Sequence, residues 1–225
     1  NAGANKIWSE QAVEIAEKYP IGVWATVGLH PDDTDEKFDY SLYKKLAQNG
    51  KVVAIGECGL DYYRIKPDDI GIKNLQKEIF IEQIKLAKEV GKPLIIHCRE
   101  AFDDLLEILE SNRKLLNNPP GIIHFFTGTL ENAEKLLEMG FYFTFGGLIT
   151  YNRDFDETIR KIPLERIMLE TDAPFVSPEP FRGKRNEPAY AEEVAKAMAK
   201  IQNVGFEEVC EKTTDNAIDI FKIKA

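Results

Sequence analysis

The stretch Lys51–Arg64, KVVAIGECGLDYYR, decides the fold because it joins a buried strand to a charged side chain. Residues 52–55 form a short apolar run, which is the pattern of a strand buried on both faces of a parallel sheet. Gly56 and Glu57 follow this run at once. An isolated charge is too costly to keep at the end of a core strand, so the Glu57 carboxylate must be paired, hydrogen-bonded or bound to a metal.

Four other apolar stretches end in a polar side chain in the same way, at His30, His97, His124 and Asp172. A lone histidine in such a place is more often a core residue that donates to a backbone carbonyl. A lone Glu57 is equally well explained by a salt bridge to a barrel-lining Arg or Lys. Five polar residues at five strand ends favour a shared site instead.

Strands and helices alternate along the chain. Alternating units indicate a parallel sheet with right-handed crossovers, either doubly wound or closed into a barrel. Polar residues of the ligand type end five of the expected strands, which suits a ring of strands around one mouth better than a single switch point. We therefore predict an α/β fold, the TIM-type (β/α)8 barrel, and expect its first one to two strands to precede Asn1. The strands are expected at 21–27, 52–57, 94–97, 122–126, 141–145 and 166–169.

Helices are predicted between these strands from apolar residues at helical spacing. The helix expected over Lys73–Val90 carries an apolar stripe that includes Leu75 and Ile79. Two short helices, over 206–211 and 213–221, are expected to close the chain. No linker or change of composition marks a boundary, so we expect a single hydrolase domain over residues 1–225, incomplete at its N-terminus.

The composition limits the partners. A net charge of -9 argues against broad electrostatic adhesion to nucleic acid or to anionic lipid, so a polyanionic substrate must be held locally. The three cysteines, Cys58, Cys98 and Cys210, show no CxxC spacing and are expected to be free and not essential in a reducing cytoplasm, with Cys58 and Cys98 as buried, inert thiols. No apolar run approaches the ~20 residues of a membrane span, and no signal-peptide pattern is present.

Glutamate, histidine and aspartate together form an oxygen and nitrogen donor set. Such a set suits Zn, Mn or Mg, and one carboxylate can bridge two ions about 3.5 to 4 Å apart. The sequence contains no Walker lysine loop, no GxGxxG after the first expected strand, no GxSxG elbow and no HExxH. Metal-assisted hydrolysis is therefore the chemistry that these residues favour.

Two further groups could contact a substrate. Arg182, Lys184 and Arg185 follow Asp172 in an otherwise acidic chain and suggest a phosphate clamp, the alternative being a solvated loop. Residues 62–64, Tyr-Tyr-Arg, could stack on bases or merely pack within their loop.

Several motifs in combination resemble the TatD family of metal-dependent deoxyribonucleases, within the amidohydrolase-like barrels. They cover essentially the whole chain, and none would suffice alone. The motifs are Val27-Gly28-Leu29-His30-Pro31, Ala54-Ile55-Gly56-Glu57-Cys58-Gly59-Leu60-Asp61, Ile96-His97-Cys98-Arg99, His124-Phe125-Phe126-Thr127-Gly128, Leu169-Glu170-Thr171-Asp172-Ala173-Pro174, Arg185-Asn186-Glu187-Pro188 and Thr213-Thr214-Asp215-Asn216.

The resemblance implies a TIM-like barrel that hydrolyses DNA phosphodiester bonds, as a 3′-to-5′ exonuclease, with one or two divalent ions (Mg, Mn or Zn). By position, Glu57 would bridge two metals, with His97 and His124 as ligands of one of them. Asp172 would be both ligand and general base. His30 and Arg99 would contact the substrate phosphate. Many members carry a His-x-His pair on the first strand, and this chain contains none, so the second metal position depends on residues expected before Asn1.

Two other functions remain open at this stage. One is a metal-dependent amidohydrolase acting on a small molecule, and the other is a catalytically silent truncated member. For the deoxyribonuclease we expect DNA as substrate, as single strands or 3′ ends, with Arg182 and Arg185 among the substrate contacts. We expect no membrane partner and a monomer.

Overall fold

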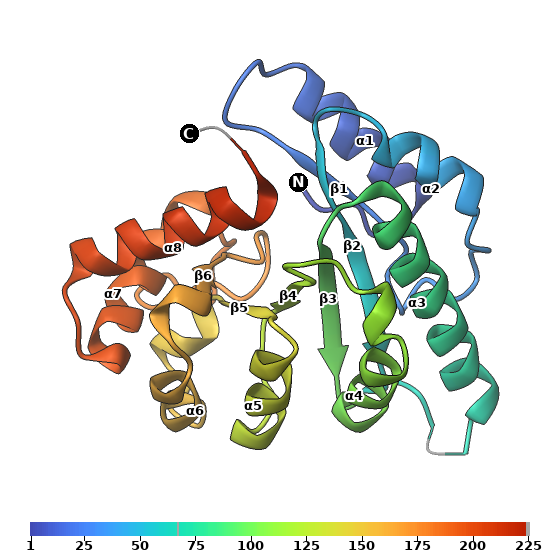
Figure 1. Cartoon of the computed structure of the whole chain (residues 1–225). Coiled ribbons are helices and arrows are strands. Elements are labelled where there is room, and N and C mark those ends of the chain that lie inside the picture. Colours follow the sequence, from blue (N-terminus) through green and yellow to red (C-terminus); the bar gives the residue numbers. More distant parts are fainter. Residues whose placement is uncertain (67, 224–225) are drawn as a thin grey trace. The chain divides into compact units, whose positions relative to one another are not determined.

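The computed structural model describes residues 1–66 and 68–223 (Figure 1). Tertiary contacts divide the chain into two compact units. Unit 1 comprises Asn1–Ile122 and the C-terminal residues from Ile220, and unit 2 comprises Ile123–Asp219. The boundary falls within strand β4, Gly121–His124. The expectation of a single domain stays a prediction.

Unit 1 contains three parallel strands that neighbour one another in chain order, with helices packed against them (Figure 1). Helix α1 contacts β1, and α2 and α3 contact β2. The strands are β1 (Ala25–Val27), β2 (Val52–Asp61) and β3 (Leu94–Arg99), and the helices are α1 (Lys6–Glu17), α2 (Tyr40–Ala47), α3 (Ile70–Val90) and α4 (Phe102–Ser111).

Unit 2 repeats the strand and helix alternation, and its strands β5 and β6 pair in parallel. Helix α7 contacts both β6 and α6. The elements are α5 (Leu130–Glu138), β5 (Tyr142–Phe145), α6 (Asp156–Lys161), β6 (Ile167–Leu169), α7 (Ala191–Gln202) and α8 (Phe206–Phe221).

Strand β2 is longer than the sequence predicted, and Glu57 lies inside it, so the placement of Glu57 at a strand end was wrong. The pairing of β2 with β3 continues as far as Asp61, opposite Arg99. A register shift between Ile55 and Cys58 marks an irregularity at Glu57. Such bulges redirect a side chain, which lets a charged residue leave the core within a continuous strand. His97 likewise lies inside β3 and not at its end.

Two glycines make this close pairing possible. Gly56 has φ +152° and Gly59 has φ +132°. A Cβ atom on Gly59 would collide with the carbonyl oxygen of His97, and one on Gly56 would lie 2.5 Å from the carbonyl oxygen of Ile95. Only glycine lets the two backbones approach so closely in this conformation.

The buried face of α3 differs from the predicted stripe. Leu75 is 37% exposed, whereas Gln76 and Gln83 are almost completely buried beside Phe80. The prediction from apolar residues missed these two positions, because glutamine is ordinarily found at the polar surface. Their amides are hydrogen-bonded to backbone groups, which allows their burial.

The remaining differences concern element ends. Strand β1 begins only at Ala25, since Gly22 adopts φ +79° and interrupts the extended run. The two expected C-terminal helices form the single helix α8, because no helix-breaking residue lies between them and the Thr213 hydroxyl donates to the carbonyl of Val209 at 2.8 Å. Over residues 1–66 and 68–223, no helix combines the length and apolar character needed to cross a membrane.

Candidate metal centre and its surroundings

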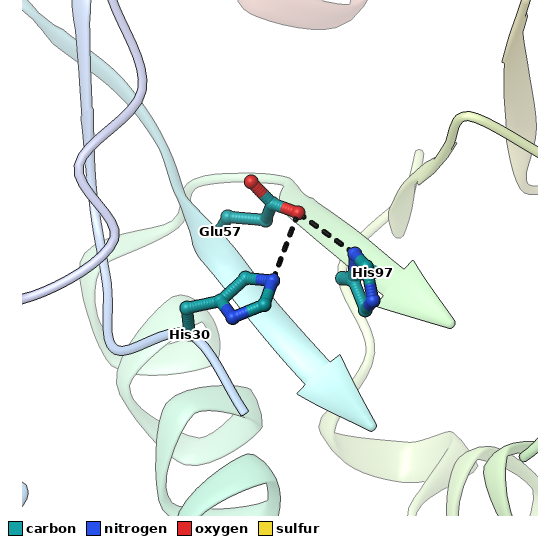
Figure 2. Close-up of side chains that lie close together, drawn as sticks. All are labelled: His30, Glu57 and His97. Carbon is teal, nitrogen blue, oxygen red and sulfur yellow. Dashed lines mark hydrogen bonds and ion pairs between the residues drawn. The ribbon is translucent and has the colours of Figure 1, made fainter. Parts of the chain in front are cut away.

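Two histidine side chains of unit 1 converge on one carboxylate oxygen of Glu57 (Figure 2). His97 Nδ1 lies 3.0 Å and His30 Nε2 lies 3.4 Å from Glu57 Oε1. One possible ligand atom from each of the three residues lies within 4.8 Å of the others. The structure therefore brings His30, Glu57 and His97 together, from a loop and two neighbouring strands.

His30 is held as a hydrogen-bond donor at this site. The backbone N–H of Asp32 donates to His30 Nδ1 at 3.1 Å, so in the neutral ring the proton belongs on Nε2. Nε2 faces Glu57, and the two imidazoles of His30 and His97 pack edge to face with ring centroids 4.5 Å apart. His30 thus presents an N–H, and not a lone pair, to the carboxylate.

His97 is bound at both ring nitrogens. Nδ1 faces Glu57, and Nε2 lies 2.8 Å from Asp61 Oδ2. Burial of the ring by itself lowers the pKa of His97, but the hydrogen bonds and charges of Asp61 and Glu57 outweigh it and raise that pKa above its ordinary value.

Asp61 is a buried carboxylate at the end of β2, and both of its oxygens have hydrogen-bond partners. Its side chain is 0% exposed and accepts from Arg99 Nε at 3.0 Å and from the backbone N–H of Tyr63 at 3.0 Å. Arg99 Nη2 lies 2.7 Å from Oδ2. Burial raises the pKa of Asp61, yet its hydrogen bonds from His97, Arg99 and Tyr63 together lower the pKa to about 2.

Arg99 occupies a position between this carboxylate and the surface. Its guanidinium lies over the Tyr63 ring at 4.4 Å, and its side chain is 38% exposed. Tyr63 is 60% exposed, whereas the Tyr62 hydroxyl donates to Asp104 at 2.7 Å. Of the two tyrosines, Tyr63 is therefore the one available for contact with another molecule, whereas Tyr62 is held by Asp104 of α4.

Gln76 and Gln83 of α3, which sequence reasoning missed, hold the segment that carries His30. Gln83 accepts from the N–H and donates to the carbonyl of Leu29, both at 2.9 Å. Gln76 donates to the carbonyl of Pro31 at 2.9 Å and accepts from the N–H of Asp61 at 2.9 Å. Their spacing of two helical turns on the face of α3 that turns to β2 was the available signal.

A second group of polar side chains lies in unit 2. His124 Nδ1 lies 2.5 Å from Glu170 Oε2, and His124 Nε2 lies 3.8 Å from Asp172 Oδ1. Glu170 Oε1 is buried without a hydrogen-bond partner in the described part of the chain. Glu170 was not among the expected site residues, although it lies two positions before Asp172 in a quoted motif.

Asp172 lies in a loop that Asn186 organises. Asn186 is buried and donates from Nδ2 to the carbonyls of Thr171 and Phe175, the latter at 2.6 Å. Asp172 has φ +52° and a side chain that is 36% exposed. A left-handed conformation at a non-glycine residue costs energy and persists only where the surroundings impose it, as Asn186 does here.

The cations of the same loop are turned to solvent. Arg182 lies over the Tyr151 ring at 4.2 Å, and Arg185 is 77% exposed with Nε 3.9 Å from Glu187 Oε1. Neither contact is a tight ion pair, so both guanidinium groups present donors at the surface of unit 2.

The residues of both groups fit a divalent metal ion. In unit 1, a carboxylate and an imidazole nitrogen whose opposite nitrogen faces a second carboxylate form the donor arrangement common at metal sites. In unit 2, the unpartnered buried oxygen of Glu170 beside His124 is an acceptor that a cation or its water would satisfy. The oxygen and nitrogen donors suit Mg, Mn or Zn.

Comparisons with known proteins relate the chain to metal-dependent hydrolases. The chain matches the TatD related DNase family over residues 1–222. It is 43% identical over 220 residues to a protein of Bacillus subtilis named "Uncharacterized metal-dependent hydrolase YabD", covering 95% of this chain and 82% of that protein. It is 34% identical over 231 residues to the "3'-5' ssDNA/RNA exonuclease TatD" of Edwardsiella piscicida, covering 98% and 86% of the two proteins.

Among solved structures, the chain is similar to YjjV, a TatD homologue from Escherichia coli, with a TM-score of 0.89. The two are 29% identical, and the match covers 99% of this chain and 85% of that one. This likeness confirms the α/β fold of the TIM-barrel type that the alternating strands and helices predicted.

Proposed function

Since this chain belongs to the TatD-related DNase family and is a metal-dependent hydrolase, we propose that it hydrolyses phosphodiester bonds of DNA from the 3′ ends of single strands. The observation that carries this proposal is the pair of histidines on Glu57, of which one is arranged as a donor and the other as a ligand. A metal-dependent phosphodiesterase uses both, because it must hold a cation and bind an anionic phosphate at the same place.

In unit 1, Glu57 and His97 would hold the metal ion, and His30 would donate its Nε2–H to a phosphate oxygen. A divalent ion bound there supplies charge for the phosphoryl oxygens and acidifies a water. The cluster is only partly exposed to solvent, since the Glu57 side chain is 16% exposed. At a partly buried site each hydrogen bond and charge acts more strongly than in water.

In unit 2, Asp172 would accept the proton of the attacking water, and His124 would be a metal ligand. Glu170 would orient His124 through Nδ1, which directs Nε2 toward Asp172. The partial exposure of Asp172 leaves its carboxylate accessible, as a general base must be.

The substrate class rests on charge and on the relatives. A chain with net charge -9 would bind a polyanion through a few local cations, and Arg99, which contacts Asp61, and Arg182 and Arg185, in the loop after Asp172, have exposed guanidinium groups. A relative that is 34% identical is named a 3′-5′ exonuclease of single-stranded DNA and RNA, which supports single strands and this polarity. The exposed Tyr63 ring offers a surface for an unpaired base.

The test is cleavage of a single-stranded oligodeoxynucleotide labelled at its 5′ end, in the presence of Mg²⁺ or Mn²⁺ and with EDTA as the metal-free control. We expect a ladder shortened stepwise from the 3′ end, lost with EDTA and lost in Glu57→Gln. Asp104→Asn is the matched control, because it removes a carboxylate charge of unit 1 that contacts Tyr62 and Lys77 and neither histidine.

Two further substrates, assayed in the same way, distinguish the DNase activity from the alternative functions. An RNA of the same sequence tests the sugar, and a nitroanilide amide tests a metal-dependent amidohydrolase. Hydrolysis of the amide without cleavage of either nucleic acid would replace the proposal by the amidohydrolase. No hydrolysis of any substrate by protein shown to bind metal would identify a catalytically silent member.

A further inference from the structure

His30 and His97 face the same oxygen of Glu57. Their other ring nitrogens, which point away from Glu57, differ in their hydrogen bonds, since the one of His30 accepts and the one of His97 donates. A backbone N–H donates to this nitrogen of His30, whereas a carboxylate accepts from this nitrogen of His97. We propose that Asp61 is a positioning residue, which holds a proton on Nε2 of His97 so that Nδ1, which faces Glu57, is the nitrogen that gives up its proton to bind a metal ion. This inference rests on the proposed metal site and adds the residue that makes His97, and not His30, the ligand.

The geometry of Asp61 supports this role. A carboxylate accepts and cannot donate when ionised, so a partner 2.8 Å away at Nε2 must be an N–H. The side chain is completely buried, and Arg99 and the Tyr63 N–H occupy its other acceptor positions. The carboxylate therefore cannot rotate away without breaking its contacts with the Arg99 guanidinium and the Tyr63 N–H.

The backbone of Asp61 is fixed as firmly as its side chain. Its N–H donates to Gln76 Oε1 at 2.9 Å, and its carbonyl accepts from Gln76 Nε2 at 3.0 Å. Gln76 is itself buried in α3 and also holds the carbonyl of Pro31. One glutamine thus sets the distance between the loop of His30 and the carboxylate behind His97.

Arg99 would connect Asp61 to the substrate phosphate. Because Nε and Nη2 of its guanidinium are both turned to Asp61, its orientation over Tyr63 depends on the same carboxylate. Loss of Asp61 should therefore weaken metal binding and phosphate binding together. A residue that served only the stability of the fold would affect neither in molecules that remain folded.

The direct test uses the parent protein with Zn²⁺ alone and ¹⁵N-labelled histidine. The chain has three histidines, so the ring signals are few, and His30→Asn and His124→Asn variants assign them. We expect the His97 ring to carry zinc at Nδ1 and to retain an Nε2–H that exchanges slowly with water. We expect His30 to keep a protonated Nε2 and to carry no zinc.

Asp61→Asn tests the role of the carboxylate, with Asp104→Asn as the matched control. Supporting carboxylates typically change metal affinity by about 10- to 100-fold, so zinc affinity by calorimetry should fall by that factor in Asp61→Asn. Its His97 Nε2–H should exchange faster, and KM for the oligonucleotide should rise. The control should change none of these values, and circular dichroism restricts the comparison to folded protein.

The outcomes separate the inference from the proposed function. Zinc on His97 Nε2 in the parent protein would overturn the role of Asp61 even if the variant cannot be folded. Unchanged zinc affinity and exchange in folded Asp61→Asn would overturn it as well. A parent protein in which neither Glu57 nor His97 is perturbed by zinc would instead refute the proposed metal site.

Discussion

The polar clusters of unit 1 and unit 2 differ in how completely the oxygens of a buried carboxylate are hydrogen-bonded. In unit 1, both oxygens of Asp61 are hydrogen-bonded. Hydrogen bonds connect Glu57 to His97, His97 to Asp61 and Asp61 to Arg99 without a gap. In unit 2, Glu170 binds His124 through one oxygen and leaves the other buried without a hydrogen-bond partner among the described residues. A closed network holds its geometry before any ligand arrives, whereas an unsatisfied acceptor costs about 1–3 kcal/mol until one does.

The largest effect is expected from Glu57→Gln, because this substitution alters the carboxylate that both His30 and His97 contact. Glutamine keeps the size of the side chain but removes the charge that holds a cation. Metal affinity and cleavage should fall together, the rate by about 10⁴-fold, at the upper limit for loss of one catalytic group. Calorimetry with Mn²⁺ and single-turnover cleavage measure both, and near-parental cleavage per folded molecule would place the chemistry elsewhere.

Asp172→Asn should reduce the rate without a matching loss of metal. The change removes the proposed proton acceptor of unit 2, for which we expect a loss of about 10²- to 10⁴-fold in rate. Metal held by Glu57 and His97 should remain, because neither residue is altered. Bound metal and kcat are measured side by side; an equal fall in both would show that Asp172 acts chiefly as a ligand.

The contrast between the two clusters predicts stability changes of different size in metal-free protein. Asp61→Asn breaks a satisfied buried pair and should lower the free energy of unfolding by about 3 kcal/mol. Glu170→Gln removes a charge from a carboxylate with one unpartnered oxygen and should change it by less than about 1 kcal/mol. Urea unfolding in EDTA compares the two variants, and equal losses would mean that the unpartnered oxygen carries no cost.

The pH dependence sharpens the same comparison. The pKa of Asp61 is lowered from 3.8 to about 2, so its stabilising contribution is present above pH 3.8 and lost as the pH falls toward 2. Parent protein should therefore lose stability over this range more steeply than Asp61→Asn. Parallel acid-unfolding curves for the two proteins would contradict a depressed carboxyl pKa in the folded state.

The smallest effect is expected at the thiols. Burial raises the pKa of both Cys58 and Cys98, so at pH 8 they remain protonated and hidden, whereas Cys210 is only half-buried. One thiol per folded molecule should react with a disulfide reagent at pH 8, and cleavage activity should persist. Mass spectrometry locates the modified residue, and rapid reaction at Cys58 would mean that β2 opens readily.

The alternation of apolar strands and helices was sufficient to predict the parallel α/β fold, because burial on both faces of a sheet requires continuous apolar runs. The same runs predicted one cluster of His30, Glu57, His97, His124 and Asp172, since strands that pair in parallel carry their polar ends to the same edge. Of these residues, the structure brings His30, Glu57 and His97 together, although Glu57 and His97 lie inside their strands. These inferences depend on local pattern and on the order of elements, which a sequence contains.

The partners of those residues were decided only by the tertiary structure. Asp61, Gln76 and Glu170 were not selected from the sequence, because a buried carboxylate or amide looks the same as an exposed one until its hydrogen-bond partners are known. The bulge that places Glu57 within β2 depends on its register with β3, which no local pattern records. Sequence alone determined which side chains could serve as ligands, and the packing of α3 and β3 around β2 decided which of their atoms face the metal site.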